Sequence, residues 1–177
     1  TGVRHRICER DGLLANVCNT HMDSLGRSPH NARIKRNNSG VLAMAKLRHI
    51  AMQVPNLQES AAYYEKLFDL DRVCDVESAY GNAVMLSDGT MNLTLLHFPE
   101  GTKGGKNSPD WAGLHHIGFV VDDKVSAGEK AVELGGKFFM ELPDDIPGVD
   151  AETKYKDPNG LVFDIADHDW TQSDRKA

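Results

Sequence analysis

The sequence predicts an α+β fold of two β-α-β-β-β modules, whose strands form one curved, cup-shaped mixed sheet with flanking helices. Two similar segments, LRHIAMQVPN at Leu47–Asn56 and GLHHIGFVVDD at Gly113–Asp123, place His49 and His116 at equivalent positions, 67 residues apart. Each segment is followed by an amphipathic helix and three short β segments, and a leucine near the end of each helix keeps the same spacing. This agreement in order, helix length and histidine placement indicates an internal duplication.

Composition limits the class of protein. A chain of 177 residues with 40% hydrophobic and 26% charged residues is typical of one globular domain or two small fused modules. No window approaches the ~18 consecutive apolar residues of a membrane helix, and the first thirty residues lack the apolar core of a secretory signal. Three cysteines form no evident disulfide framework, and the net charge of −6 disfavours nucleic acid. We therefore expect a cytoplasmic protein with a small-molecule partner and neither a nucleic-acid nor a membrane partner.

Residues 1–43 differ from the rest of the chain. They hold seven Lys/Arg against three Asp/Glu, whereas residues 44–177 hold 13 against 23. They show neither a helical nor a strand period, and they are rich in Arg, Asn, Ser and His. We expect an extension outside the fold. A metal knuckle of His5, Cys8, Cys18 and His21 is a weaker alternative, because its spacing matches no zinc pattern.

The first module is expected at residues 44–98. After a strand at Leu47–Val54, Asn56 is a good helix N-cap with Glu59 three residues later, and the apolar period continues to about Phe68. The three predicted β segments that follow are Arg72–Glu77, Tyr80–Leu86 and Met91–Phe98. Residues 99–112 are rich in Gly and Pro and are predicted to be a linker.

The second module is expected at residues 113–168, with a C-terminal tail at 169–177. Its first strand, Leu114–Val121, leads to a helix from about Lys124 to Leu134, which Gly135 ends as a left-handed cap. A loop at Pro143–Gly148 interrupts the later strands. These strands are predicted near Lys137–Leu142, Ala151–Lys156 and Leu161–Ala166.

Strand alternation places polar side chains on one face of this sheet. Ile117 and Phe119 fall on the bulky side, which we expect under a helix, while His116 falls on the other side beside small neighbours that leave room in front of the imidazole. In the last strand, Asp164 lies among small apolar residues, where a carboxylate is costly unless it is paired or bound to a cation. His115 should point to the opposite face from His116 and have a structural role.

Curving the two modules around one cup would bring His49, His116 and Asp164 together. Two neutral imidazoles and one carboxylate suit one divalent ion, either Fe, Mn, Ni or Zn, with positions left open for substrate. A histidine on a strand is more commonly a hydrogen-bonded structural residue. The matched positions of His49 and His116 nevertheless favour ligation of a metal.

The pattern RHIAMQV…HHIGFVV…DPNGLVFDI resembles the vicinal oxygen chelate superfamily over about residues 46–168. This group includes glyoxalase I, methylmalonyl-CoA epimerase, extradiol dioxygenases and bleomycin resistance proteins. The resemblance implies a metal in the cup of paired modules, with His49 and His116 as ligands and Asp164 in place of the closing Glu. The fourth ligand, often Glu or Gln, would fall on Thr94 or, less favourably, on Asn92. It also implies a homodimer.

The resemblance implies a metal-dependent, glyoxalase-like lyase or isomerase that acts on a small oxygenated substrate chelated to the ion. Because Thr94 is not a carboxylate, the general base must come from elsewhere, and we expect catalytic roles for Asp164, Glu141 and Tyr155, with Glu152 as a further choice. An extradiol-type dioxygenase with a His-His-Asp iron site is the alternative. A metal-free, drug-binding protein is the third possibility.

Overall fold

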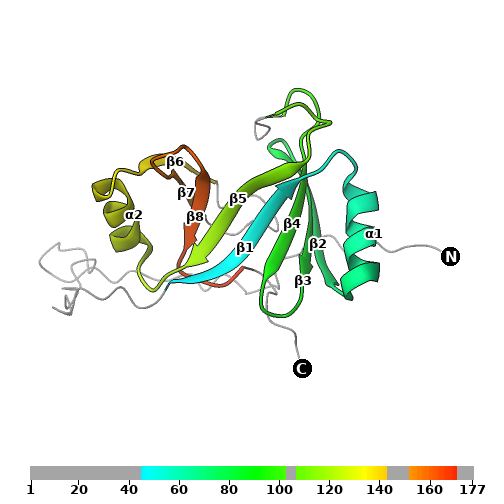
Figure 1. The fold of residues 1–177 in the computed structure, drawn as a ribbon, viewed down its shortest axis with the longest axis horizontal. Helices are drawn as coiled ribbons and strands as arrows, with labels where there is room; N and C mark the ends of the chain where they lie inside the picture. The colour runs from blue at the N-terminus through cyan, green and yellow to red at the C-terminus, as the bar shows by residue number, and fades with distance from the viewer. Residues whose placement is uncertain (1–44, 103–106, 143–151, 171–177) are drawn as a thin grey trace, which may run out of the picture.

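The computed structural model describes residues 45–102, 107–142 and 152–170 (Figure 1). The predicted extension at 1–43 and the predicted loop at Pro143–Gly148 lie outside these residues, as does most of the predicted tail. Neither helix in the described part of the chain is long and apolar enough to cross a membrane.

The first module has the predicted order of elements. Asn56 caps the helix by accepting a hydrogen bond from the backbone N–H of Glu59, and its side-chain amide donates to the Glu59 carboxylate. The helix ends at Asp69, whose φ of 55° lies in the left-handed region. The elements are β1 (Lys46–Gln53), α1 (Leu57–Phe68), β2 (Asp71–Ser78), β3 (Gly81–Ser87) and β4 (Asn92–His97).

The second module repeats this order. Asp123 caps its helix by accepting from the backbone N–H of Ser126. Gly135 follows the helix at a φ of 94°, and Gly136 donates back to the carbonyl of Ala131, which confirms the predicted glycine ending. The elements are β5 (Gly113–Val120), α2 (Lys124–Glu133), β6 (Lys137–Glu141), β7 (Thr153–Lys156) and β8 (Val162–Ala166).

All eight strands form one sheet in the order β2-β3-β4-β1-β5-β8-β7-β6. Each module pairs its first strand in parallel with its last, β1 with β4 and β5 with β8. The two first strands, β1 and β5, pair antiparallel at the centre. Outward from the centre, each module therefore places its first strand, then its last, then its third and then its second. The α+β fold of paired modules predicted from the internal repeat is confirmed.

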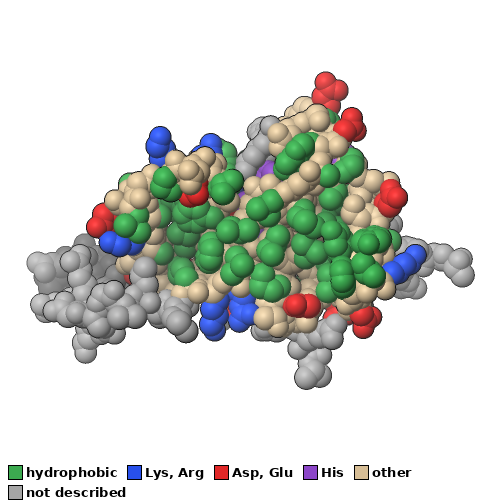
Figure 2. Space-filling model, viewed as in Figure 1, with side chains coloured by type: hydrophobic (Ala, Val, Ile, Leu, Met, Phe, Trp, Pro, Cys, Tyr) green, Lys and Arg blue, Asp and Glu red, His purple; other side chains and the backbone are tan. Residues whose placement is uncertain are grey.

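The helices cover only the outer parts of one sheet face. Helix α1 packs on β3 and β4, and α2 packs on β6, β7 and β8. Between them, the bulky side chains of β1 and β5 form an apolar strip on the face seen in Figure 2. Ile117 and Phe119 lie in this strip and are only half-buried. The expectation that a helix covers this side was wrong in this respect, because each helix follows the strands that close its own module.

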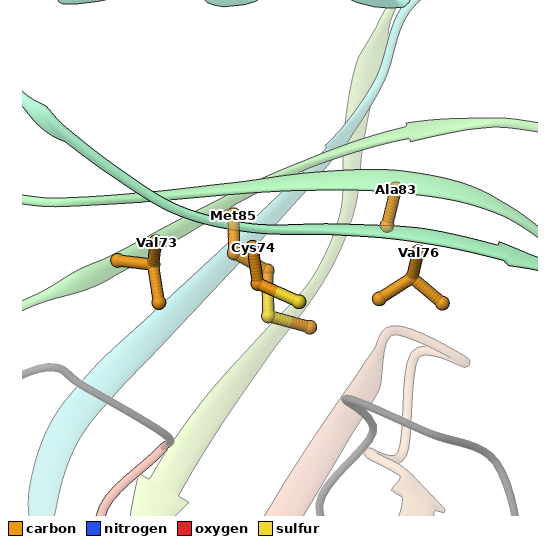
Figure 3. Close-up of a cluster of buried hydrophobic side chains, with 5 residues drawn as sticks. All are labelled: Val73, Cys74, Val76, Ala83 and Met85. Atoms are coloured by element: carbon orange, nitrogen blue, oxygen red, sulfur yellow. The ribbon is translucent and has the colours of Figure 1, made fainter. Parts of the chain in front are cut away.

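The opposite, concave face of the first module is also apolar. Figure 3 shows side chains that extend from β2 and β3 toward the same side and form a buried cluster. The cluster consists of Val73, Cys74, Val76, Ala83 and Met85. Because Met85 is paired with Thr94 of β4, and Thr94 with Ala51 of β1, this cluster lies on the same face as the polar side chains of the centre.

Candidate metal centre

The register of the sheet aligns four polar side chains and one glycine, from five strands, in one row. Asn92 of β4 is paired with His49 of β1, and His49 with Gly118 of β5. Gly118 is in turn paired with Asp164 of β8, and Asp164 with Lys154 of β7. All five residues are buried. The row crosses the boundary between the modules, so residues far apart in the chain meet on one face.

His49, His116 and Asp164 form a compact cluster on this face. One ligand atom from each residue lies within 4.8 Å of the others. The two histidine Nε2 atoms are 3.0 Å apart, and Nε2 of His116 is 3.1 Å from Oδ2 of Asp164. The structure thus brings together the three residues that the sequence selected. Their ligation of a metal stays a prediction.

The orientation of His49 is fixed from β4. Nδ1 of His49 lies 2.8 Å from the amide oxygen of Asn92, which accepts a second hydrogen bond from the hydroxyl of Thr94 at 2.7 Å. Since that oxygen can only accept, Nδ1 carries the hydrogen and Nε2 presents its lone pair to the cluster. Thr94, predicted as a fourth ligand, has its hydroxyl on Asn92 instead and is not part of the three-residue cluster.

His116 is held by its neighbour His115, which the sequence placed on the other face. The register shifts between Ala51, paired with His116, and Met52, paired with Leu114, so His115 is the extra residue of a β-bulge. Nδ1 of His115 consequently lies 2.6 Å from Nδ1 of His116. The prediction that His115 points away was wrong, because a bulge interrupts strict alternation.

Burial and nearby positive charge keep His116 neutral. Desolvation is the main cause that lowers its pKa well below the usual 6.5, followed by the charge of Lys154 and then by His49. Only a neutral imidazole has a lone pair for a metal. His116 is therefore in the protonation state that a ligand requires at neutral pH.

Lys154 gives Asp164 its charged partner. Nζ of Lys154 lies 2.5 Å from Oδ2 of Asp164 and 2.9 Å from Oε2 of Glu152, and all three side chains are buried. Burial lowers the pKa of Lys154, but the charges of Glu152 and Asp164 together outweigh it and raise this pKa. Two buried carboxylates thus share one ammonium group.

The donor set fits one divalent ion. Metal–nitrogen bonds of about 2.0–2.1 Å place neighbouring ligand atoms roughly 3 Å apart, as the two histidine Nε2 atoms are. Oδ1 of Asp164 is buried, and no described residue donates a hydrogen bond to it. A buried carboxylate oxygen without a donor is costly, and a cation would satisfy it.

Trp170 fills the space in front of the histidines. The sequence had predicted that the small neighbours of His116 leave this space open. It is 2% exposed, and its ring stacks on His49 with 4.8 Å between centroids and 4° between planes. A Cβ atom on Gly118 would lie 2.6 Å from this ring, so only glycine fits there. The indole N–H donates to Oε1 of Glu152. The small neighbours of the histidines thus accommodate a tryptophan from beyond β8.

Glu141 and Tyr155 are not brought to the cluster. Tyr155 packs against Gly128 of α2, and burial together with the charge of Glu141 raises its pKa. Glu141 contacts Lys124 of α2 at 3.9 Å. Both side chains thus lie on the helix-covered face, because Tyr155 follows Lys154 directly in β7 and neighbouring side chains point to opposite faces.

Sequence reasoning missed Lys154 and gave Trp170 no definite role. Glu152 and Lys154 are two residues apart in a predicted strand, and this spacing indicates that they share a face. Nothing in the sequence indicates which face of β7 meets Asp164, and no pattern near Trp170 indicates where its ring lies.

Comparisons with known proteins show which sequences this chain resembles. A sequence profile of the Glyoxalase/Bleomycin resistance protein/Dioxygenase superfamily matches residues 46–165. The mitochondrial methylmalonyl-CoA epimerase of Dictyostelium discoideum is 35% identical over 91 residues, which are 48% of this chain and 54% of that protein. The chain therefore spans about half the length of this curated relative.

Solved structures share the fold. Methylmalonyl-CoA epimerase from Mycobacterium tuberculosis aligns with a TM-score of 0.56 and 12% identity, over 67% of this chain and 85% of that one. A Streptomyces coelicolor methylmalonyl-CoA epimerase in complex with 2-nitronate-propionyl-CoA aligns with a TM-score of 0.55 and 18% identity, over 68% and 94%.

Proposed function

Because the chain belongs to the Glyoxalase/Bleomycin resistance protein/Dioxygenase superfamily, we propose that it is a metal-dependent isomerase that moves a proton beside a carbonyl group of a small oxygenated substrate. The observation that carries this proposal is the buried cluster of His49, His116 and Asp164 where the two modules meet. These three residues would hold the ion. When bound, it would act as a Lewis acid toward an oxygen of the substrate.

The surrounding residues orient this ligand set. Asn92 fixes the ring of His49, and His115 contacts the nitrogen of His116 that faces away from the cluster. Such partners of ligating histidines set their tautomer and basicity. The hydroxyl of Thr94 donates to the same Asn92 oxygen that contacts His49, and so helps to hold that oxygen in place.

Glu152 is our choice for the proton carrier. Of the candidates that are not proposed ligands, Glu152 contacts the cluster through Lys154, whereas Glu141 and Tyr155 lie on the other face. Its Oε1 accepts the indole N–H of Trp170. Oε1 could take a proton from substrate only where the indole N–H does not occupy it.

An acyl-CoA thioester with an acidic hydrogen beside its carbonyl is the first substrate class to test. The Dictyostelium relative is named for methylmalonyl-CoA, and the Streptomyces enzyme was solved with a propionyl-CoA analogue. The Dictyostelium relative is named as a mitochondrial protein. The cytoplasmic location predicted from the sequence of this chain therefore stays a prediction.

An extradiol-type dioxygenase remains the second candidate, because two histidines and one carboxylate also form the usual ligand set of non-haem iron oxygenases. A glyoxalase-like lyase would use the same cluster on a hemithioacetal. These activities differ in their co-substrates and can be separated by assay.

The test begins with chelator-treated protein reloaded with Fe²⁺, Mn²⁺, Co²⁺, Ni²⁺ or Zn²⁺ in turn. With methylmalonyl-CoA in D₂O, NMR should show deuterium entering the carbon beside the thioester carbonyl. We expect His49→Ala to reduce this exchange at least 100-fold, and His97→Ala, which removes an imidazole outside the cluster, to leave it unchanged. Absence of exchange with every ion would contradict the proposal. Turnover of a hemithioacetal, or oxygen uptake with a catechol, would instead assign the lyase or dioxygenase.

A further inference from the structure

Lys154 is an unusual neighbour for a metal ligand. Lysine is almost never fully buried unless it is paired, and Lys154 is 6% exposed within the sheet. Its ammonium contacts one oxygen each of Asp164 and Glu152. The site therefore contains a cation of its own, supplied by β7.

This ammonium engages only one side of the Asp164 carboxylate. Nζ lies 2.5 Å from Oδ2, whereas Oδ1 receives no hydrogen bond from any residue in the described ranges. Oδ2 is also the atom 3.1 Å from His116. The two oxygens of Asp164 thus differ: Oδ2 contacts the lysine, and Oδ1 has no hydrogen-bond donor among the described residues.

The net charge of the buried side chains also indicates that Lys154 weakens the attraction of the site for a cation. Beside the imidazoles, the buried ionisable side chains are two carboxylates that contact one ammonium, a set with one net negative charge. Removing the ammonium would leave two negative charges beside the cluster. A divalent cation is attracted more strongly by the second arrangement, and burial weakens the screening of such interactions.

We infer that Lys154 determines the metal affinity of the cluster, because its ammonium competes with the ion for Asp164 and leaves Oδ1 as the oxygen available to it. This inference rests on the proposed function, since it requires that the cluster binds an ion. It assigns to Lys154 a role in keeping the ion weakly held and exchangeable.

Isothermal titration of chelator-treated protein with Co²⁺ and with Mn²⁺ tests this role. Lys154→Met should bind both ions at least ten-fold more tightly than the wild type, and Lys154→Arg, which keeps the charge, should not. Lys156→Met is the matched control, because Lys156 lies on the same strand but has its ammonium 4.0 Å from the centre of the Phe139 ring. The metal affinity of Lys156→Met should equal that of the wild type.

Loss of one partner from a buried ion pair is destabilising, so Lys154→Met alone could fail to fold. A double variant that also removes the charge of Glu152 avoids this problem. Glu152→Gln combined with Lys154→Met keeps the net charge of the site and releases Oδ2 of Asp164. It should bind Co²⁺ more tightly than the wild type, and its melting temperature should rise more when Co²⁺ is added.

If neither Lys154→Met nor the double variant Glu152→Gln/Lys154→Met binds Co²⁺ more tightly than the wild type does, the role of Lys154 is overturned, while the proposed function stands because the wild type binds. Failure of the wild type and of both Lys154→Met variants to bind any ion would overturn the metal-dependent function and this inference together.

Discussion

At the scale of single residues, each histidine of the cluster depends on a partner that points its lone pair inward. For His49 this partner is Asn92, a neighbour on β4. For His116 it is His115, which follows from one extra residue in β5. Both partners lie outside the set of ligands, and each contacts the Nδ1 of its histidine while Nε2 faces the cluster.

This arrangement predicts that His115→Ala weakens metal binding. Without the contact to Nδ1, the ring of His116 is less well oriented, and loss of such a partner typically costs 10–100-fold in metal affinity. His116→Ala removes a ligand and should abolish binding. Titration calorimetry with Co²⁺ would compare the two. Wild-type affinity in His115→Ala would show that the His115–His116 contact does not orient the ligand.

At the scale of elements, the segment after β8 acts as a cover for the cup. Residues 167–170 continue from β8, Asp169 lies 3.4 Å from Arg48 of β1, and Trp170 stacks on His49. The indole also contacts Gly118 and hydrogen-bonds Glu152. This short segment therefore connects both modules across the site.

We predict that Trp170→Ala opens the site at a cost in stability. Replacing a buried tryptophan with alanine typically lowers the free energy of unfolding by about 3–5 kcal/mol. Because the ring no longer shields His49, a chelator should extract bound Co²⁺ at least ten-fold faster. Urea unfolding and stopped-flow absorbance would measure the two effects.

The control is Trp111→Ala, a tryptophan of equal size that contacts Gly113 at the start of β5 rather than the cluster. It should leave the extraction rate unchanged. An extraction rate in Trp170→Ala equal to that of the wild type would mean that Trp170 does not limit access.

At the scale of the whole molecule, the central strands leave an apolar strip between the two helices (Figure 2). Contiguous exposed apolar surface of this kind marks contact sites more often than chance. The homodimer implied by the family resemblance would cover it with a second copy of the chain. Assembly of this protein stays a prediction.

Phe119→Glu tests this assembly, because a charge in the strip would disfavour burial against a second copy. We expect sedimentation of the wild type at micromolar concentration to give about twice the chain mass of 19.5 kDa, and the variant to shift toward a single chain. Glu129→Lys, an exposed charge change on α2, should sediment as the wild type does. A wild-type particle of a single chain would contradict the dimer.

The sequence by itself determined the fold and three residues of the site. The 67-residue repeat predicted two modules, the cap at Asn56 predicted where the first helix begins, and alternation placed His49, His116 and Asp164 on one face. These features depend on local periodicity and capping, which are written in neighbouring residues.

Only the tertiary structure decided what surrounds those three side chains. Lys154 meets Asp164 because β7 and β8 pair in one particular register, and Trp170 covers His49 because the chain turns back after β8. A β-bulge, which no alternation pattern shows, turns His115 toward His116. Strand register, bulges and the return of a terminal segment arise from contacts between residues far apart in the chain, so no local sequence pattern could specify them.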